Sequence, residues 1–429
     1  MNISRLKKIT LFILVMLASS SLYTQTGIDS PYSRFGIGQL EQKTLHPRLR
    51  AMGGIGNAIN SNTFVNYSNP ASYSSFDTLS FLFNAGLSAS SATLRTTTQN
   101  ETSSNARLEY ITLGFPVNRW LRASFGLLPY SNVGYDIIIP FENELTGNYA
   151  KVFSGSGGLN RFYGGAAFKI FDNLSAGFNA TYIFGQTTNS ILVYFPDSNY
   201  YANTKIENKI RTNAFVFDYG LHYTINLEND YLLTAGLTFG QQMNLSAKRE
   251  YTVKSLFGGF SDGIEYVLDT IDYRPSESGK LIIPSSTGMG FTFQKKNKWM
   301  AGIDFNWQNW EKFKAFEVSD SLVNSWNLAV GGQFTPSHTS ISKYWQRVTY
   351  RVGARYDQTY LNLRNEPLNE FGITFGLGLP FPRSLTTLDL SLEVGRRGTT
   401  ANNLVQETYV NLTLGVSIYE RWFVKRRYQ

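Results

Sequence analysis

The residue types that most often ligate metals or act as catalytic bases are scarce in this 429-residue chain, which has three histidines and no cysteine. His46, His222 and His338 are far apart, and none has a second ligand at a metal-binding spacing. His222 shares a strand face with Asp218, but four residues along a strand separate the two by roughly 13 Å, too far for a base and its orienting partner. With no nucleophile–base pair either, the sequence predicts no enzyme, no catalytic residue, no metal and no cofactor.

Charged residues form a second group, and their spacing predicts that they face a polar interior. In the segment YRVGARYD (350–357), Arg351, Arg355 and Asp357 lie on one strand face and apolar residues on the other. Charges inside a barrel either line a wet pore or pair with a plug. The residues predicted to face inward in this way are Asp304, Arg351, Arg355, Asp357, Asp389 and Glu393.

The elements that must position these charges are strands. In TLDLSLEVG (387–395), apolar residues at every second position alternate with Asp389, Ser391 and Glu393. This period of two recurs along most of the chain, and an apolar face that repeats so often indicates lipid outside a barrel with a polar interior. The sequence therefore predicts an all-β transmembrane antiparallel barrel of about 14 strands. The predicted strands are 78–95, 106–117, 119–139, 158–171, 173–195, 208–226, 230–253, 280–295, 298–317, 323–335, 346–361, 369–379, 385–397 and 405–418.

Composition agrees with a barrel. Hydrophobic residues make up 42% and mean hydropathy is −0.21, as expected when half of each strand faces a polar lumen. Aromatic residues reach 15%, which suits strands and interfacial girdles. The net charge is +8, but without a recognised binding module it does not indicate nucleic acid.

The chain divides into four parts. Basic residues followed by the apolar run 9–18 predict a signal peptide at 1–24, with cleavage after Ser20 or just before Gln25. Residues 25–77 lack strand alternation and are predicted to be a hatch, or plug, in the lumen. Arg34, Arg48 and Arg50 of this part are expected to hold it partly through pairs with the inward charges. The barrel follows at 78–418. A basic periplasmic tail is expected at 419–429; it is either a solvated end or a contact with anionic lipid or a partner.

Short and long connections alternate along the chain. Bacterial barrels have short periplasmic turns and longer extracellular loops, so this parity predicts an outer-membrane protein of a Gram-negative bacterium with both termini periplasmic. Four tryptophans fall at predicted periplasmic strand ends, as a girdle at the lipid interface would require. They are Trp120, Trp299, Trp345 and Trp422.

The third predicted strand contains an irregularity at PYSNVG. Because proline cannot donate to the ladder, it marks a bulge, a kink or an edge. Two interpretations stay open: a side opening of the barrel wall, or a strand that ends early and continues as loop. The residues of this candidate lateral gate are Pro129, Tyr130, Ser131, Asn132, Val133 and Gly134.

Six segments of the chain have a recognisable family pattern. They are FGIG (35–38), AMGGIGNA (51–58), NPASY (69–73), GSGGLNRFYGG (155–165), IPSSTGMGF (283–291) and WMAGIDFNWQNW (299–310). Together they resemble the FadL family of outer-membrane transporters for long-chain fatty acids and other hydrophobic compounds. The resemblance covers nearly all of the mature chain and implies a 14-stranded barrel, a hatch, and a kinked third strand through which apolar ligand leaves laterally. By this resemblance the hatch motif comprises Gly53, Gly54, Asn69 and Pro70.

Two functions follow as expectations. The first is passive transport of hydrophobic small molecules such as long-chain fatty acids through the kinked strand, with membrane lipid and the ligand as partners. The alternative is a non-transporting barrel subunit of an outer-membrane secretion or assembly complex, with protein partners. A continuous apolar path from the extracellular loops through 129–134 would favour transport. A hatch closed by ion pairs, together with an apolar surface patch that does not face lipid, would favour the subunit. Fold alone does not separate them.

Overall fold

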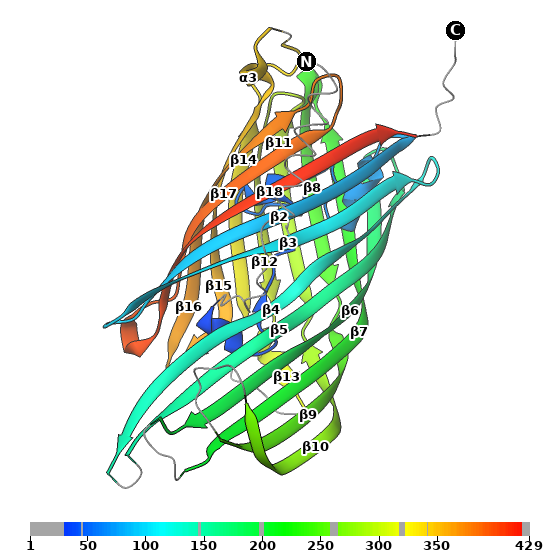
Figure 1. The fold of residues 1–429 in the computed structure, drawn as a ribbon. Coiled ribbons are helices and arrows are strands. Elements are labelled where there is room, and N and C mark those ends of the chain that lie inside the picture. The colour runs from blue at the N-terminus through cyan, green and yellow to red at the C-terminus, as the bar shows by residue number, and fades with distance from the viewer. Residues whose placement is uncertain are drawn as a thin grey trace, which may run out of the picture.

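The computed structural model describes residues 30–43, 46–144, 147–196, 201–257, 265–316, 322–340 and 342–422. The described strands form one antiparallel sheet that closes on itself through the pairing of β18 with β2, and the result is a barrel (Figure 1). The predicted signal peptide and the last seven residues of the predicted tail lie outside the described residues.

The strands are longer than the predicted ones in several places. They are β1 (Gln39–Leu40), β2 (Ser80–Arg95), β3 (Asn100–Pro116), β4 (Leu121–Asn143), β5 (Gly147–Lys169), β6 (Leu174–Tyr194), β7 (Asn203–Asn226), β8 (Tyr231–Gly240), β9 (Met243–Phe257), β10 (Tyr266–Ile283), β11 (Ser286–Lys295), β12 (Trp299–Gln308), β13 (Lys314–Ala315), β14 (Ser325–Phe334), β15 (Thr349–Leu363), β16 (Glu366–Pro380), β17 (Thr387–Arg397) and β18 (Gln406–Arg421).

The barrel wall has 14 strands, as predicted. The two-residue strands β1 and β13 are short additions to the sheet. The strands β8 and β9 pair in succession along β7, so they form one wall strand interrupted at Gln241–Gln242. In the same way β10 pairs with β9 and β11 pairs with β8, so β10 and β11 together count as one wall strand.

The two faces of the wall differ as the alternation predicts. On β17, Leu392 and Val394 are 40% and 43% exposed, whereas Asp389, Ser391 and Glu393 are buried. Apolar side chains therefore cover the outside of the barrel and polar ones point into its lumen. This distribution is the one that a bilayer requires of a spanning barrel.

Turn chemistry sets the strand connections at both ends. The carbonyl of the Asn118 side chain accepts hydrogen bonds from the backbone N–H groups of Trp120 and Leu121, which closes the turn from β3 to β4. At the other end, Arg364 and Asn365 both have positive φ and make the two-residue hairpin between β15 and β16.

The prediction that residues 254–279, between the predicted strands 230–253 and 280–295, form a loop is wrong. Most of these residues belong to the hairpin of β9 and β10. The strands β4, β5 and β7 likewise extend beyond the predicted spans, and the 24 residues of β7 reach roughly 79 Å. A tilted strand needs only about 9–11 residues to cross the bilayer, so the remainder projects from one end of the barrel. Both faces of a projecting strand are accessible to water, so apolar alternation is absent there and the sequence pattern gives no signal.

The described helices all have six residues or fewer. None of those present in the described residues is long and apolar enough to cross a membrane. The four predicted girdle tryptophans lie at the end of the barrel with the turns β3–β4 and β11–β12, and Trp422 stacks on Phe81 with 4.1 Å between ring centroids. The helices are η1 (Pro31–Arg34), α2 (Pro47–Arg50), η2 (Pro70–Ser75), η3 (Glu228–Asp230), η5 (Trp310–Lys312), α3 (Tyr344–Arg347) and η6 (Ala401–Asn403).

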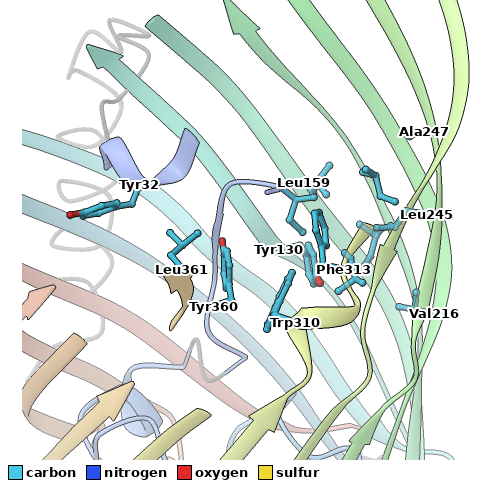
Figure 2. Packing of buried hydrophobic residues seen from close by; sticks show 14 of the residues in the cluster. Tyr32, Tyr130, Leu159, Val216, Leu245, Ala247, Trp310, Phe313, Tyr360 and Leu361 are labelled. Atoms are coloured by element: carbon cyan, nitrogen blue, oxygen red, sulfur yellow. The ribbon is translucent and has the colours of Figure 1, made fainter. Parts of the chain in front are cut away.

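Residues 30–77, called the N-terminal segment below, lie inside the barrel, where they contact inward-facing residues of strands all round the wall. Toward the projecting end, Tyr32 and Ile37 join an apolar cluster with Trp310 and Phe313 from the β12–β14 connection (Figure 2). Toward the turn end, the residues Tyr67 to Phe76 pack against β2 to β5. The N-terminal segment therefore packs against the wall toward both ends of the lumen.

Candidate functional site

The contact surface between the N-terminal segment and the wall contains the two predicted glycines. Gly53 and Gly54 have φ of +72° and +85°, and the N–H of Gly54 closes α2 by donating to Leu49. A Cβ on Gly53 would lie 2.6 Å from the carbonyl oxygen of Ala354. Glycine is therefore required at position 53 by the backbone conformation and by the approach to β15.

The other predicted pair, Asn69 and Pro70, begins helix η2. The Asn69 side-chain oxygen caps the helix by accepting from the N–H of Ala71, and its amide nitrogen donates to the carbonyl of Asn57 at 2.7 Å. The same amide also reaches the carbonyl of Leu221 in β7 at 3.2 Å. Asn69 thus joins two parts of the N-terminal segment to the wall.

The inward charges meet the N-terminal segment directly. Arg48 Nε lies 3.1 Å from Asp389 Oδ2, and Arg351 Nη1 lies 2.8 Å from Asp389 Oδ1. The Asp389 side chain is fully buried. Arg48 also donates to the hydroxyls of Thr63 and Thr387, at 2.8 Å and 2.6 Å. A buried carboxylate shared by two guanidinium groups is a strong tether, because removing either partner leaves a buried charge uncompensated.

A second ion-pair group ties the segment to β3. Arg50 Nη2 lies 3.1 Å from Glu109 Oε2, and Arg107 Nη2 lies 2.7 Å from Glu41 Oε1. Each strand partner therefore finds an opposite charge in the N-terminal segment. Glu109 is fully buried and also accepts from Ser88. Lys43 pairs with Asp218 of β7 at 2.9 Å, on another side of the lumen.

Asp304 of β12 holds the segment without an ion pair. Its Oδ2 accepts from the backbone N–H groups of Gly56 and Asn57 at 2.6 Å and 2.7 Å. The Asn57 carbonyl in turn contacts His222 Nε2 at 2.7 Å. His222 is thus a buried contact of the N-terminal segment.

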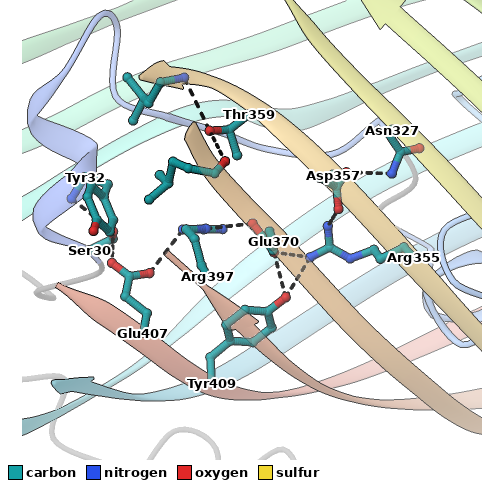
Figure 3. Close-up of polar contacts among 12 residues, drawn as sticks. Ser30, Tyr32, Asn327, Arg355, Asp357, Thr359, Glu370, Arg397, Glu407 and Tyr409 are labelled. Atoms are coloured by element: carbon teal, nitrogen blue, oxygen red, sulfur yellow. Dashed lines mark hydrogen bonds and ion pairs between the residues drawn. The ribbon is translucent and has the colours of Figure 1, made fainter. Parts of the chain in front are cut away.

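The remaining predicted charges belong to a network across neighbouring wall strands (Figure 3). Arg355 pairs with Asp357, Glu370 and Glu393. Glu370 also accepts from Arg397 at 2.6 Å, and the network continues to Glu407 and the Ser30 hydroxyl. Two arginines thus each bind more than one carboxylate, and the first described residue of the N-terminal segment is bound to the chain of charges.

Sequence reasoning found six of the inward charges. It missed others that lie at alternate positions on the same inward strand faces. Arg397 lies on the inward face of β17 with Asp389 and Glu393, and period two would have identified it. Arg48 and Arg50 of the N-terminal segment were expected to pair with inward charges, and each forms an ion pair with a wall carboxylate. The missed residues of these networks are Arg107, Glu109, Glu370, Arg397, Glu407 and Tyr409.

The candidate gate residues lie within β4, which runs unbroken past them, so the interpretation that the strand ends there is wrong. The register with β5 shifts between Pro129 and Ser131, which marks a bulge at Tyr130. The inner side of this stretch is covered: Ser131 and Asn132 pair with β1, and the N–H of Ser30 donates to the carbonyl of Gly134. Val133 is also buried.

The strands β3 and β4 pair over only six residues of each, 111–116 with 122–127. Beyond that point their edges diverge, as Figure 1 shows for the cyan and teal strands. The N-terminal segment is bound to the edge of β4 at the place where pairing with β3 has ended.

The lumen contains a cavity of about 390 Å³ between the N-terminal segment and the wall. Ion-pair residues line much of it, including Arg50, Glu109, Arg355 and Glu370. None of the residues 129–134 lines it. Among the described residues no group of three or more metal-ligating side chains is placed to hold an ion. The ion pairs and hydrogen bonds hold the N-terminal segment against the wall, and the cavity beside it has charged and apolar lining residues.

Comparison with known proteins identifies the fold. The toluene transporter TodX of Pseudomonas putida superposes with a TM-score of 0.58 at 16% identity, over 91% of this chain and 100% of that one. The toluene transporter TbuX of Ralstonia pickettii gives 0.57 at 13%, over 88% and 99%. A Pseudomonas aeruginosa FadL homologue gives 0.55 at 14%, over 86% and 98%. These neighbours are transport proteins and the fold is that of FadL-type outer-membrane transporters.

The sequence comparisons identify the family. No curated protein matches the chain. The sequence model of the BamG family matches residues 5–429. The chain therefore belongs to the BamG family and has a FadL-type barrel whose lumen is occupied by its own N-terminal segment.

Proposed function

We propose that this chain is a closed, non-transporting outer-membrane barrel that serves as a subunit of a membrane protein complex, in secretion or in barrel assembly. One observation supports the proposal most: the N-terminal segment, acting as a permanent hatch, is bound to the wall by buried charges at several points of the lumen. Breaking a single buried ion pair costs about 3–5 kcal/mol, and displacement of the hatch would break several. Binding of a small apolar molecule makes no interaction that offsets this cost.

The lining of the cavity supports the same conclusion. Arg355, Glu370 and Arg397 satisfy one another there. A hydrocarbon that filled this cavity would displace water from charged groups without replacing their hydrogen bonds, which is unfavourable. Toward the projecting end Trp310 stacks on Tyr360 in the apolar cluster, and both side chains also line this cavity.

With the lumen closed, function is expected at the surfaces. We place both termini in the periplasm and the long strands β4 to β7 outside the cell, because the short turns, the exposed tryptophans and the end of β18 lie at the same end of the barrel. Trp422 follows β18, and Lys425, Arg426 and Arg427 come next in the sequence. This basic stretch is the proposed periplasmic handle for a partner.

The experiment is affinity purification in mild detergent from cells with native expression, with mass spectrometry of the proteins that accompany the barrel. We expect envelope proteins in near-equal amounts. A variant that lacks residues 423–429 should lose them while it keeps the heat-modifiable mobility of a folded barrel. Purification of the unaltered barrel alone, with bound apolar ligand, would contradict the proposal.

A second candidate, passive uptake of hydrophobic small molecules such as long-chain fatty acids, is favoured by the separation of β3 from β4. The edges that diverge there provide a place where the residues 129–134 would act as a lateral gate once β1 had moved. Uptake of radiolabelled oleate or toluene by cells tests it: an alternating Val/Thr sequence at 129–134 should abolish uptake. Uptake equal to that of cells without the protein would exclude this function.

A further inference from the structure

The outward face of β7 defines the outer boundary of the bilayer. Every second residue from Phe215 to Ile225 is an exposed large apolar or aromatic side chain. Ten residues of a strand tilted by about 45° cover roughly 23 Å of membrane thickness, close to the ~25 Å apolar band of such barrels. The next outward positions are Asn213 and Arg211, so Arg211 lies at the level of the lipid headgroups.

Aromatic residues mark this boundary on the neighbouring strand as well. Tyr182 of β6 lies 4.9 Å from Phe215, between ring centroids, and 5.7 Å from Phe184. Aromatic rings gather where hydrocarbon meets headgroups. Gln186 follows on the same face of β6 and lies directly opposite Arg211.

Two cations face each other at this level. Arg211 of β7 and Lys248 of β9 are register partners, and both are exposed, whereas the alternate residues Thr212 and Ala247 are buried. Side chains in this relation are about 5 Å apart at Cβ, and like charges there are destabilising. Neither cation forms an ion pair with a carboxylate of the described residues. The Arg211 Nε donates to Gln186 Oε1 at 2.9 Å, which orients the guanidinium.

A second pair of cations lies farther from the membrane and provides a contrast. Lys205 and Lys254 are also register partners on the outer face. Lys205, however, pairs with Glu265 and with Glu207, the latter at 3.7 Å. The outer like-charge pair is thus compensated by the chain itself, and the pair at the headgroup level is not.

We propose that Arg211 and Lys248 bind a phosphate group on the headgroup of an outer-leaflet lipid. A guanidinium binds phosphate through two parallel hydrogen bonds and an ammonium adds a point charge, so the two together suit a phosphate monoester. The apolar row below them contacts the acyl chains of the same lipid, and Gln186 holds the guanidinium in place. This lipid site goes beyond the proposed subunit role. It rests on the proposed function only for the orientation of the barrel, with β4 to β7 outside the cell.

The test uses the purified full-length barrel in nanodiscs of phosphatidylcholine, with lipid A that carries two phosphates as the probe. Native mass spectrometry counts lipid A retained after detergent release, and a titration gives its affinity. The double variant Arg211→Gln, Lys248→Gln should bind roughly thirtyfold more weakly, since each cation near a membrane surface contributes about a factor of five. The matched control Lys205→Gln, Lys254→Gln removes the same charge and should bind as the unaltered barrel does.

Three outcomes would overturn the proposal: equal binding by the double variant, equal binding of dephosphorylated lipid A, or an equal loss in the control variant. Inorganic phosphate at the same concentration should not compete, because it lacks the acyl chains. If the double variant does not fold, Lys248→Gln alone, which keeps Arg211 and its hydrogen bond to Gln186, gives a smaller loss of the same sign. Failure of the subunit proposal would appear in co-purification and leave these lipid measurements unchanged.

Discussion

Arg48 of the N-terminal segment and Asp389 of β17 are 341 residues apart in sequence and form an ion pair in which the carboxylate has no exposure to solvent. Arg351 shares the same carboxylate from the wall side. Asp389 therefore joins a segment without sequence periodicity to the barrel through one fully buried group.

Replacement of this carboxylate should loosen the segment. The variant Asp389→Asn leaves Arg48 and Arg351 without their shared anion, and we expect a loss of about 3–5 kcal/mol in the free energy of unfolding. Urea unfolding in lipid vesicles, followed by tryptophan fluorescence, measures it. Asp172→Asn, in an exposed turn pair with Lys169, is the control and should be neutral. Equal stability of Asp389→Asn and the unaltered barrel would contradict the tether.

Close backbone contact gives a second prediction. A Cβ on Gly353 of β15 would lie 2.2 Å from the backbone nitrogen of Gly53, so Gly353→Ala should push the N-terminal segment away from the wall at a cost of about 1–3 kcal/mol or more. Single-channel conductance should then show leak. Gly164→Ala is the matched control, because a Cβ there meets nothing within 4 Å. Leak in the control, or none in Gly353→Ala, would contradict the prediction.

His46 predicts a dependence of stability on pH. It is buried in the N-terminal segment, with Nε2 3.0 Å from the Ser417 hydroxyl, and burial lowers its pKa from 6.5 to about 3, against the opposing effect of Asp389. As pH falls, His46 is therefore protonated in the unfolded chain before it is protonated in the folded one. The stability that the folded state has above pH 6.5 is lost progressively toward pH 3. By pH 5 the loss reaches about 2 kcal/mol.

The measurement is urea unfolding at a series of pH values. His46→Gln should show a flatter profile between pH 6.5 and pH 5, where few carboxylates titrate. Parallel profiles for the two proteins would show that His46 does not titrate in this way.

A cross-link separates the two candidate functions. Leu40 of β1 and Ser131 of β4 are register partners, at a separation that a disulfide accepts. Because the chain has no other cysteine, Leu40→Cys with Ser131→Cys forms a single defined bond on oxidation. A subunit with a fixed hatch should keep its protein partners when oxidised. A transporter should lose uptake when oxidised and regain it on reduction.

Single cysteines also test the proposed orientation. Thr98 lies in the connection from β2 to β3 and Arg119 in the turn from β3 to β4, at opposite ends of the barrel, and both are exposed. In intact cells a membrane-impermeant maleimide should label Thr98→Cys and leave Arg119→Cys unlabelled until the outer membrane is permeabilised. The reverse pattern would place the termini outside the cell.

The sequence by itself determined the wall. Period two decides which side chains face lipid and which face the lumen, because alternation is a local property of any extended strand. Asp389, Glu393, Arg351 and Arg355 could therefore be placed inward from neighbouring residues alone. The short turns were equally local, since Asn118 closes its turn with its own side chain.

Only the tertiary structure decided what those charges do. The partners Arg48 and Asp389, or Arg50 and Glu109, are brought together by barrel closure, and no spacing in the sequence encodes that distance. The projecting hairpin of β9 and β10 was missed because β10 has no buried residue from Tyr266 to Lys280, so burial imposes no alternation there. Whether the lumen is open or filled depends on how 14 strands enclose the N-terminal segment, which is a property of the whole chain.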